Sequence, residues 1–306
     1  MTEQSMENVR EGHILKGIGG FYYVETPERV YECRARGLFR KDGITPLAGD
    51  RVSVSVLPDG TGTVEEILPR RNFLERPPVA NLDTLVIVAS VREPHPNTLM
   101  IDRMIAQAVF CGIEPVLVIS KTDLESAGPL SEIYRKAGVL FFSVSAVTGE
   151  GVEELEKILT GKTTVFTGNS GVGKSTLLNS MFRSFHLQTG EISKKLGRGR
   201  HTTRQVELLK LEGGGYVADT PGFSSFDSRS FAEIRKEDLA GCFSDFAPYV
   251  GQCRFTSCTH TCEEGCAVIE AVRRGDVSGS RHESYVSMYR EMKEKKEWNK
   301  KEKSAW

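Results

Sequence analysis

The sequence lacks any long apolar run and any excess of charge of one sign. None of its apolar stretches approaches the roughly 18 residues that a membrane-spanning helix needs, and its first residues lack the basic start and apolar stretch of a secretory signal. Forty Lys and Arg residues balance forty-one Asp and Glu residues to a net charge of −1, which excludes a strongly basic nucleic-acid-binding chain as a bulk property. We therefore expect a cytoplasmic protein with no membrane partner.

The cysteines are clustered. Four of the seven cysteines fall within fourteen residues, and the odd total without a secretory signal argues against a disulfide framework. Three thiolates and an imidazole suit a closed, structural Zn²⁺ site, and the chain offers them at Cys253, Cys258, His260 and Cys266. Cys262 is a fifth candidate for four coordination places, and spacing alone does not exclude it. We expect one structural zinc ion in a small domain that depends on it.

The pattern of apolar, polar and turn-forming residues changes twice along the chain. Its first part consists of short β-favouring stretches separated by glycine-containing turns, which predicts a small β-barrel with the OB-fold as one candidate. Its middle part alternates continuous apolar runs with helical patterns, which predicts an α/β domain with a parallel sheet and helices on both sides. Its last part carries the cysteine cluster and a charged tail and is expected to be mostly helical. We place the three domains at residues 1–75, 76–227 and 228–306.

A glycine-rich loop in the middle part carries the strongest motif. Residues 168–175 match the pattern GxxxxGK[ST], follow an apolar run and open a helical stretch, which is the context that a phosphate-binding loop requires. The glycines let backbone N–H groups turn toward phosphate oxygens at a helix N-terminus. We expect Lys174 to reach the β- and γ-phosphates and Ser175 to bind Mg²⁺. The nucleotide-binding residues predicted here are Gly168, Asn169, Ser170, Gly171, Val172, Gly173, Lys174, Ser175 and Thr176.

A second motif predicts that the nucleotide carries guanine. Residues 120–123 read Ser-Lys-Thr-Asp and resemble the guanine-specifying pattern NKxD. A carboxylate at Asp123 accepts hydrogen bonds from both N1–H and the exocyclic amine of guanine, a donor pair that adenine lacks, while the stem of Lys121 covers the purine. Ser120 replaces the usual Asn, so a loop-tying amide is lost and we expect lower nucleotide affinity. The predicted base-site residues are Ser120, Lys121, Thr122 and Asp123, with Ser145 and Ala146 placed to meet guanine O6.

The order of the motifs is unusual. Asp219 and Gly222 form a DxxG pattern some fifty residues after the phosphate loop, suited to holding the Mg²⁺ shell and to contacting the γ-phosphate. Translational GTPases place the phosphate loop first, whereas here the base motif comes first. A circular permutation preserves the same site and leads from DxxG directly into the C-terminal domain. Changes at the γ-phosphate are then able to reposition that domain as a unit.

A basic, glycine-containing segment before DxxG, residues 194–204, is the predicted switch. Thr203, or alternatively Thr202, supplies a second hydroxyl to Mg²⁺ when the γ-phosphate orders the loop. Phe223 stands where many GTPases carry a water-orienting Gln, so we expect slow intrinsic turnover that needs an activator. His201 is the nearest replacement, and a contact to phosphate or RNA is an equal interpretation of it. The predicted catalytic residues are His201, Lys174 and Thr203.

The permuted order, the N-terminal barrel and the cysteine cluster together resemble the RsgA family of ribosome small-subunit-dependent GTPases. The resemblance extends over essentially the whole chain. It implies an OB-fold, a circularly permuted GTPase domain and a zinc domain, with GTP hydrolysis that the 30S subunit stimulates during its late maturation. It also implies that Cys262 is variable, supports His201 in hydrolysis, and implies zinc ligation by Cys253, Cys258, His260 and Cys266.

Local basic segments indicate contacts with RNA. We expect the barrel to bind 16S rRNA, and residues 290–303 hold seven Lys or Arg and four Glu, either as a solvated helix face or as an RNA contact. We expect a monomer that binds GTP, GDP and the 30S subunit. Two other functions stay open: an RNA-binding module with nucleotide-gated affinity that hydrolyses little GTP, and a permuted GTPase of the large subunit. The barrel and the cysteine cluster favour the small subunit.

Overall fold

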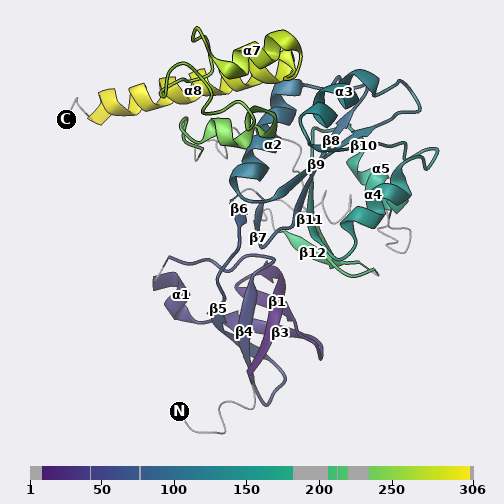
Figure 1. The fold of residues 1–306 in the computed structure, drawn as a ribbon. Helices are drawn as coiled ribbons and strands as arrows, with labels where there is room; N and C mark the ends of the chain where they lie inside the picture. The colour runs from purple at the N-terminus through teal and green to yellow at the C-terminus, as the bar shows by residue number, and fades with distance from the viewer. Residues whose placement is uncertain are drawn as a thin grey trace. The chain divides into compact units, whose positions relative to one another are not determined.

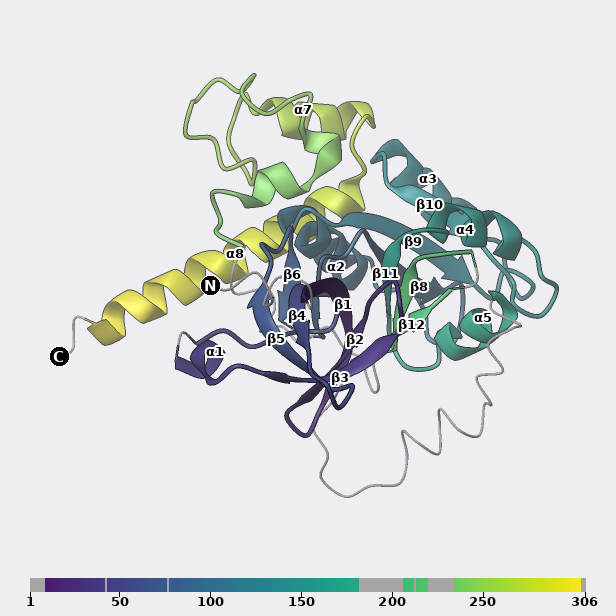
Figure 2. The same cartoon turned by 90° about the horizontal axis from the view of Figure 1, so that it is seen from below.

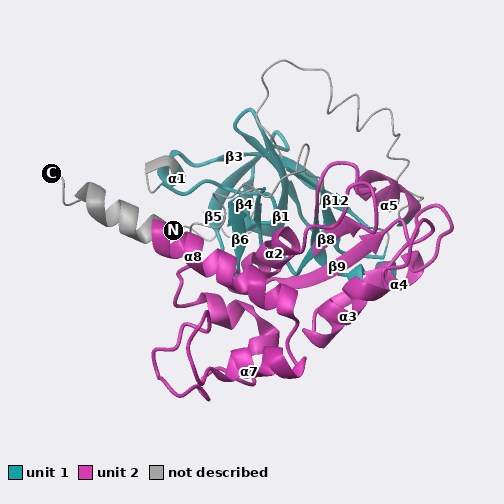
Figure 3. Ribbon diagram, turned by 90° about the horizontal axis from the view of Figure 1, so that it is seen from above, with its two compact units in different colours: residues 1–85, 156–166, 181–224 teal, residues 86–155, 167–180, 225–306 magenta. Residues whose placement is uncertain are grey.

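The computed structural model of the chain describes residues 9–41, 43–75, 77–181, 206–211, 213–219 and 234–303. The chain divides into two compact units, and each unit is built from segments that are far apart in the sequence. Unit 1 contains residues 1–85, 156–166 and 181–224, and unit 2 contains residues 86–155, 167–180 and 225–306 (Figure 3). The three domain boundaries proposed from the sequence stay a prediction.

A five-stranded barrel forms the N-terminal part of unit 1 (Figure 1). Its neighbouring strands are antiparallel except for β3 and β5, and pairing of β1 with β4 closes the order β1-β2-β3-β5-β4. The small β-barrel predicted from the sequence is therefore confirmed. The elements are β1 (Val9–Ile18), β2 (Phe21–Glu25), β3 (Val30–Ala35), the short helix α1 (Gly37–Lys41), β4 (Arg51–Val56) and β5 (Gly62–Ile67).

Alternation of buried and more exposed residues explains how these strands close around one core. Strands β3 and β4 each bury two residues at alternate positions, so that successive side chains point to opposite faces. At Gly62, a Cβ atom would lie 2.6 Å from Cys33 Sγ and 2.8 Å from Val54 Cγ1, so a larger residue does not fit. The barrel core consists of Ile14, Val24, Tyr31, Cys33, Val52, Val54 and Val64.

Unit 1 continues from the barrel into a second group of strands, β11 (Thr163–Thr167), β12 (Glu207–Lys210) and β13 (Tyr216–Asp219). Strand β11 is parallel to β13, and β12 is antiparallel to β13. Strand β12 also pairs with β1 of the barrel through Lys16 and Glu207, and Lys16 Nζ lies 2.7 Å from a carboxylate oxygen of Glu207. One ladder of strands therefore connects the barrel to the strand that ends at Asp219.

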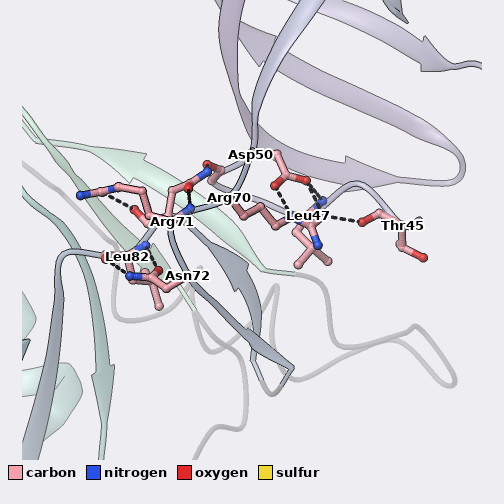
Figure 4. Close-up of polar contacts among 9 residues, drawn as sticks. Thr45, Leu47, Asp50, Arg70, Arg71, Asn72 and Leu82 are labelled. Atoms are coloured by element: carbon pink, nitrogen blue, oxygen red, sulfur yellow. Dashed lines mark hydrogen bonds and ion pairs between the residues drawn. The ribbon is translucent and has the colours of Figure 1, made fainter. Parts of the chain in front are cut away.

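The segment that follows the barrel is held mainly by side chains. Asp50 is fully buried and accepts hydrogen bonds from Leu47 N and from Arg70 Nε, both at 2.7 Å (Figure 4). Asn72 both donates to Leu82 O and accepts from Leu82 N. These bonds fix the predicted connector, which contains a two-stranded sheet made of β6 (Phe73–Glu75) and β7 (Pro78–Ala80).

Unit 2 contains most of the predicted α/β part. The strand order is β10-β9-β8, and β10 is parallel to β9. Strand β8 is buried along its whole length, as expected for a strand covered on both faces, and the predicted α/β class is confirmed. The strands are β8 (Thr84–Ser90), β9 (Glu114–Ser120) and β10 (Leu140–Ser143), and the helices are α2 (Thr98–Phe110), α3 (Gly128–Lys136) and α5 (Lys174–Met181). Helix α4 (Val152–Leu159) begins in unit 2 and continues into unit 1.

Local signals set the ends of the helices in unit 2. Asn97 caps the N-terminus of α2, where its side chain accepts a hydrogen bond from Met100 N at 3.1 Å. Gly275 ends the helix Ala267–Arg274 (α7) in a left-handed conformation with φ +81°. None of the described helices combines the length and the apolar character needed to cross a membrane.

The C-terminal part of unit 2 packs on α2 (Figure 2). Arg281 is buried between the two: its Nη1 donates to Asp102 Oδ1 at 2.7 Å, while Nε and Nη2 donate to Asp245. Burial raises the pKa of Asp102 to about 6 because its carboxylate loses water. This part consists of η3 (Leu239–Cys242), η4 (Ser244–Phe246), α7 and the long helix α8 (Gly279–Lys303).

Candidate nucleotide site and metal centre

The predicted phosphate loop connects β11 to α5. Strand β11 ends at Thr167 and α5 begins at Lys174, so the loop lies at the N-terminus of the helix. Gly168 has φ +144°, and a Cβ atom at this residue would lie 2.0 Å from Val88 O of β8. Only glycine fits this position. The loop thereby turns at a helix N-terminus, where backbone N–H groups and the helix dipole attract anionic phosphates.

Lys174 folds back over this loop. Its ammonium group donates to the carbonyl oxygens of Gly168 and Asn169, the latter at 2.9 Å. Burial lowers the pKa of Lys174 because the ammonium group loses water. A phosphate bound in the loop would stabilise the charged form again. Ser175 and Thr176 are exposed at the start of α5, so their hydroxyl groups are accessible to a metal–nucleotide complex.

The base motif is tied to the phosphate loop. Ser120, the last residue of β9, is buried, and its hydroxyl oxygen lies 2.5 Å from Val172 O and 3.2 Å from Ala89 O. A hydroxyl has one proton, so it donates to the nearer carbonyl of the phosphate loop. The amide of the usual Asn is absent, but a single hydroxyl still makes a tie between the two motifs. The lower nucleotide affinity expected from this replacement stays a prediction.

Asp123 and Ser145 meet at the other end of the base motif. Ser145 is fully buried, and its hydroxyl donates to Asp123 Oδ1 at 2.6 Å. The bond orients the carboxylate of Asp123, which is exposed and therefore accessible to the paired donors of a guanine base. Lys121 adopts φ +61° and donates through Nζ to Glu93 O, which holds the lysine stem beside the motif. These contacts fix the residues that the sequence predicts for the base site.

Unit 2 therefore brings the phosphate loop together with the base motif, including Thr122, whose N–H donates to Val144 O, and Ala146, which follows Ser145. Asp219 ends β13 in unit 1, and its side chain is outside the described part of the chain. Also outside the described residues are the predicted switch 194–204 and the residues His201, Thr202, Thr203, Gly222 and Phe223.

Four of the predicted metal ligands converge in the C-terminal part of unit 2. The ligand atoms of Cys253, Cys258, His260 and Cys266 all lie within 4.8 Å of one another. His260 Nδ1 lies 3.5 Å from Cys253 Sγ and 3.4 Å from Cys266 Sγ. Cys262 is exposed and is not one of the four. Among the described residues, the geometry thus selects the set that the family resemblance implies.

The chemistry of this Cys₃His cluster indicates a zinc site. Three thiols and an imidazole match the ligand set of a closed tetrahedral site, which has no open place for a substrate. Burial raises the pKa of Cys258 to about 12, and a bound dication reverses this effect because the thiolate is the form that binds metal. Burial also lowers the pKa of His260, which favours the neutral imidazole that a metal requires.

Two contacts in unit 2 have no signal in the sequence. The carbonyl of Glu93 holds the Lys121 ammonium group, although the two residues are 28 positions apart. Arg281 bridges Asp102 and Asp245 across separations of 179 and 36 residues. A lysine beside a base motif and an arginine on a charged helix both suggest solvated side chains, so only the fold reveals these partners.

A phosphate loop, a guanine-type base motif and an order that begins with the base motif define a circularly permuted GTPase. Residues 67–229 match the family model described as RsgA GTPase, and residues 11–64 match the RsgA N-terminal domain. A curated relative from Caldanaerobacter subterraneus subsp. tengcongensis, named small ribosomal subunit biogenesis GTPase RsgA, is 48% identical over 95% of this chain and 98% of its own length. A relative of the same name from Geobacillus thermodenitrificans is 44% identical over 94% of this chain and 98% of its own.

Solved structures agree with this match. The crystal structure of YjeQ from Thermotoga maritima is 35% identical, with a TM-score of 0.79 over 93% of this chain and 98% of that one. The structure of YloQ, described as a circularly permuted GTPase, is 34% identical, with a TM-score of 0.78 over 96% of this chain and 99% of that one. The chain belongs to the RsgA GTPase family and is a GTP hydrolase, so the family and the enzyme class predicted from the sequence are confirmed.

Proposed function

We propose that this chain binds GTP with Mg²⁺ and hydrolyses it on the small ribosomal subunit, during late maturation of that subunit in the cytoplasm. The observation that carries the proposal is the bond from Ser120 to Val172 O, because it joins guanine recognition and phosphate binding within one unit. The choice of partner is supported by the curated relatives, which are named small ribosomal subunit biogenesis GTPases.

Different residues of the site bind the base and the phosphates of the nucleotide. Asp123, oriented by Ser145, accepts the N1–H and exocyclic amine of guanine, and the stem of Lys121 lies along the ring. The N–H groups of the phosphate loop and the ammonium group of Lys174 bind the β- and γ-phosphates. Because these groups are fixed before the reaction, they stabilise the charge that develops on the transferred phosphoryl group.

Three residues would hold Mg²⁺, which supplies positive charge at the phosphate oxygens when it is bound. Ser175 stands at the start of α5 and Asp219 at the end of β13, where a hydroxyl and a carboxylate serve this ion in phosphate-loop proteins. Thr203 supplies the third group. His201 orients the attacking water with the help of the subunit, because Phe223 has no polar group to do so. This arrangement makes turnover slow until the subunit is bound.

The barrel supplies a surface for rRNA. The Arg34 guanidinium lies 4.9 Å from the centre of the Phe21 ring, and the Lys16 ammonium lies 5.2 Å from that of Tyr23. Both rings are partly exposed. Basic groups of this kind bind backbone phosphates, while aromatic rings stack on unpaired bases. We assign these pairs to contacts with 16S rRNA, made by a monomer.

The cysteine cluster completes the proposal with one structural zinc ion per chain, bound by Cys253, Cys258, His260 and Cys266. The cluster lies among the buried residues of the C-terminal part, and Cys266 is only 1% exposed. Because a small part of a protein has a small core, a metal replaces some of the missing apolar contacts. Zinc here stabilises structure and takes no part in GTP hydrolysis.

Turnover of GTP by the purified protein tests this function. Hydrolysis is measured for the protein alone, with 30S subunits and with 50S subunits at one salt concentration. We expect slow turnover alone, strong stimulation by 30S subunits and no stimulation by 50S subunits. Stimulation by 50S subunits would instead assign the chain to the large subunit, and an absence of hydrolysis in every arm would leave a nucleotide-gated RNA-binding module.

A binding measurement separates the switch from the hydrolysis. If GTP orders the switch and strengthens binding to 30S subunits, a non-hydrolysable GTP analogue must give tighter 30S binding than GDP does. By linkage, 30S subunits must then favour the analogue over GDP by the same factor. Equal affinity of the two nucleotide forms for 30S subunits would contradict the switch.

A further inference from the structure

Glu263, which lies between two of the metal ligands, binds the backbone of its own loop. Its Oε1 accepts a hydrogen bond from Thr259 N at 2.7 Å and another from the Thr259 hydroxyl. Its Oε2 accepts hydrogen bonds from Thr261 N at 3.0 Å and from Cys262 N at 3.1 Å. One carboxylate therefore gathers three backbone N–H groups and a hydroxyl from three residues of the loop, Thr259, Thr261 and Cys262.

These bonds surround an unusual backbone conformation at His260. Its φ is +58°, in the left-handed region that residues other than glycine rarely adopt. Thr259 and Thr261 are the neighbours of His260, and the N–H groups of both are bound to Glu263. The resulting turn carries His260 Nδ1 to 3.5 Å from Cys253 Sγ and 3.4 Å from Cys266 Sγ.

Helix α8 binds the carbonyl groups of the same loop. The Tyr285 hydroxyl donates to Thr259 O at 2.8 Å, and His282 Nε2 lies 2.8 Å from His260 O. The N–H groups of the loop are thus held by Glu263 and its carbonyl groups by α8. The backbone on both sides of the histidine ligand is fixed by protein groups alone.

The charge of Glu263 suits this role. Burial alone would raise the pKa of Glu263, but the hydrogen bonds from the Thr259 hydroxyl and from the backbone N–H groups lower it to about 2. The group is therefore a carboxylate at neutral pH. Both of its oxygens accept from the loop, and it is not one of the residues whose ligand atoms converge.

We propose that Glu263 is a positioning residue of the metal centre, whose carboxylate holds His260 in the left-handed turn that directs its imidazole toward the thiolates. The role rests on the zinc ion of the proposed function. Residues that orient metal ligands without touching the metal typically change metal affinity by about 10- to 100-fold when they are replaced. We therefore expect replacement of Glu263 to weaken zinc binding by a factor in this range.

The test compares Glu263→Ala and Glu263→Gln with Glu264→Ala, in the full-length protein. Glu264 is the exposed neighbour, so its replacement removes the same charge one position away. Zinc affinity is measured by competition with a chromogenic chelator. Cobalt(II), loaded in place of zinc, reports the ligand geometry through its thiolate charge-transfer and d–d absorption bands.

We expect Glu263→Ala to bind zinc about 10- to 100-fold more weakly than wild type and to have altered cobalt bands. Glu263→Gln keeps the volume of the side chain but turns an amide N–H₂ toward backbone donors, so it should behave like the alanine variant. Glu264→Ala should bind zinc as wild type does.

Equal zinc affinity and identical cobalt bands in all three variants would overturn the role of Glu263 while leaving the zinc site intact. A wild-type protein that takes up no zinc would overturn the metal centre and this role with it. If Glu263→Ala does not fold even with zinc, Glu263→Gln decides the comparison.

Discussion

The nucleotide site and the metal centre lie in the same unit but are built in different ways. The nucleotide site joins segments near residues 88, 120, 145 and 168, and several of its bonds end on backbone carbonyls. The metal centre takes its four ligands from fourteen consecutive residues, 253–266, in a stretch without strands.

This difference indicates what keeps each site in its shape when no ligand is bound. A turn that follows a buried strand keeps its shape without a ligand, because the sheet holds the backbone that leads into it. The metal loop has a backbone that is held by Glu263 and α8, but the thiolates that it brings together repel one another unless a cation binds them. We therefore expect nucleotide binding to depend on fold geometry, and the C-terminal part to depend on its metal.

The largest effect should follow from removal of a zinc ligand. Cys266→Ser should lose zinc and unfold the part of the chain after about residue 228, because structural zinc contributes on the order of 10 kcal/mol of binding free energy. Hydrogen exchange should show fast exchange there and continued protection of β8 and β9.

Cys253→Ser should behave in the same way. Cys262→Ser is the matched control, since Cys262 is exposed, and it should keep its zinc. Loss of zinc from the control would contradict the ligand assignment, and equal loss of protection in β8 and β9 would remove the contrast between the two sites.

The next largest effect should come from breaking the buried ion pairs of Arg281, which connect α2 to the C-terminal part of unit 2. Arg281→Met leaves Asp102 and Asp245 buried without their cation, which costs about 3–5 kcal/mol of unfolding free energy. Chemical denaturation measures the loss, and Arg290→Met on the exposed side of the same helix should change stability by less than about 0.5 kcal/mol. A similar loss in both variants would mean that the buried ion pair does not join the two regions.

Base recognition should respond next. Asp123→Asn removes an acceptor for two donors of guanine and should weaken GDP binding by about 3 kcal/mol. The new amide can donate to the 2-oxo group of xanthine, so the variant should gain affinity for xanthosine diphosphate. Calorimetric titration with each nucleotide measures the loss of affinity for GDP and the gain of affinity for xanthosine diphosphate. If the variant binds GDP as tightly as wild type, the base site has been placed wrongly.

The smallest effect should come from loss of the hydrogen bond between the Ser120 hydroxyl and Val172 O in the nucleotide site. Ser120→Ala leaves Val172 O without its hydroxyl donor and should weaken GDP binding by about 1–2 kcal/mol. Ser120→Thr keeps the hydroxyl and should restore most of the affinity. Titration of the two variants decides the matter, because an equal loss in both would show that the hydroxyl is not responsible.

The sequence predicts the parts of these sites that depend on short spacings. Alternating residues such as Val52 and Val54 predict the barrel, and a glycine at 168 before a lysine and a serine predicts the phosphate loop. It does not predict contacts across long separations, such as the 52 residues between Ser120 and Val172. It also leaves Cys262 open as a ligand, because the direction of each thiol depends on a loop conformation that Glu263 stabilises.

The pairing of β1 with β12 also bears on how the chain is synthesised. Lys16 and Glu207 are 191 residues apart, whereas the five barrel strands lie within the first 67 residues. At translation rates of about 5–20 residues per second, the barrel can close roughly seven to thirty seconds before β12 has been made. During that time the edge of β1 near Lys16 is unpaired and can form a β-ladder with another nascent chain. We therefore expect misassembly of this chain to be most frequent when translation is slow or when ribosomes are crowded on one mRNA.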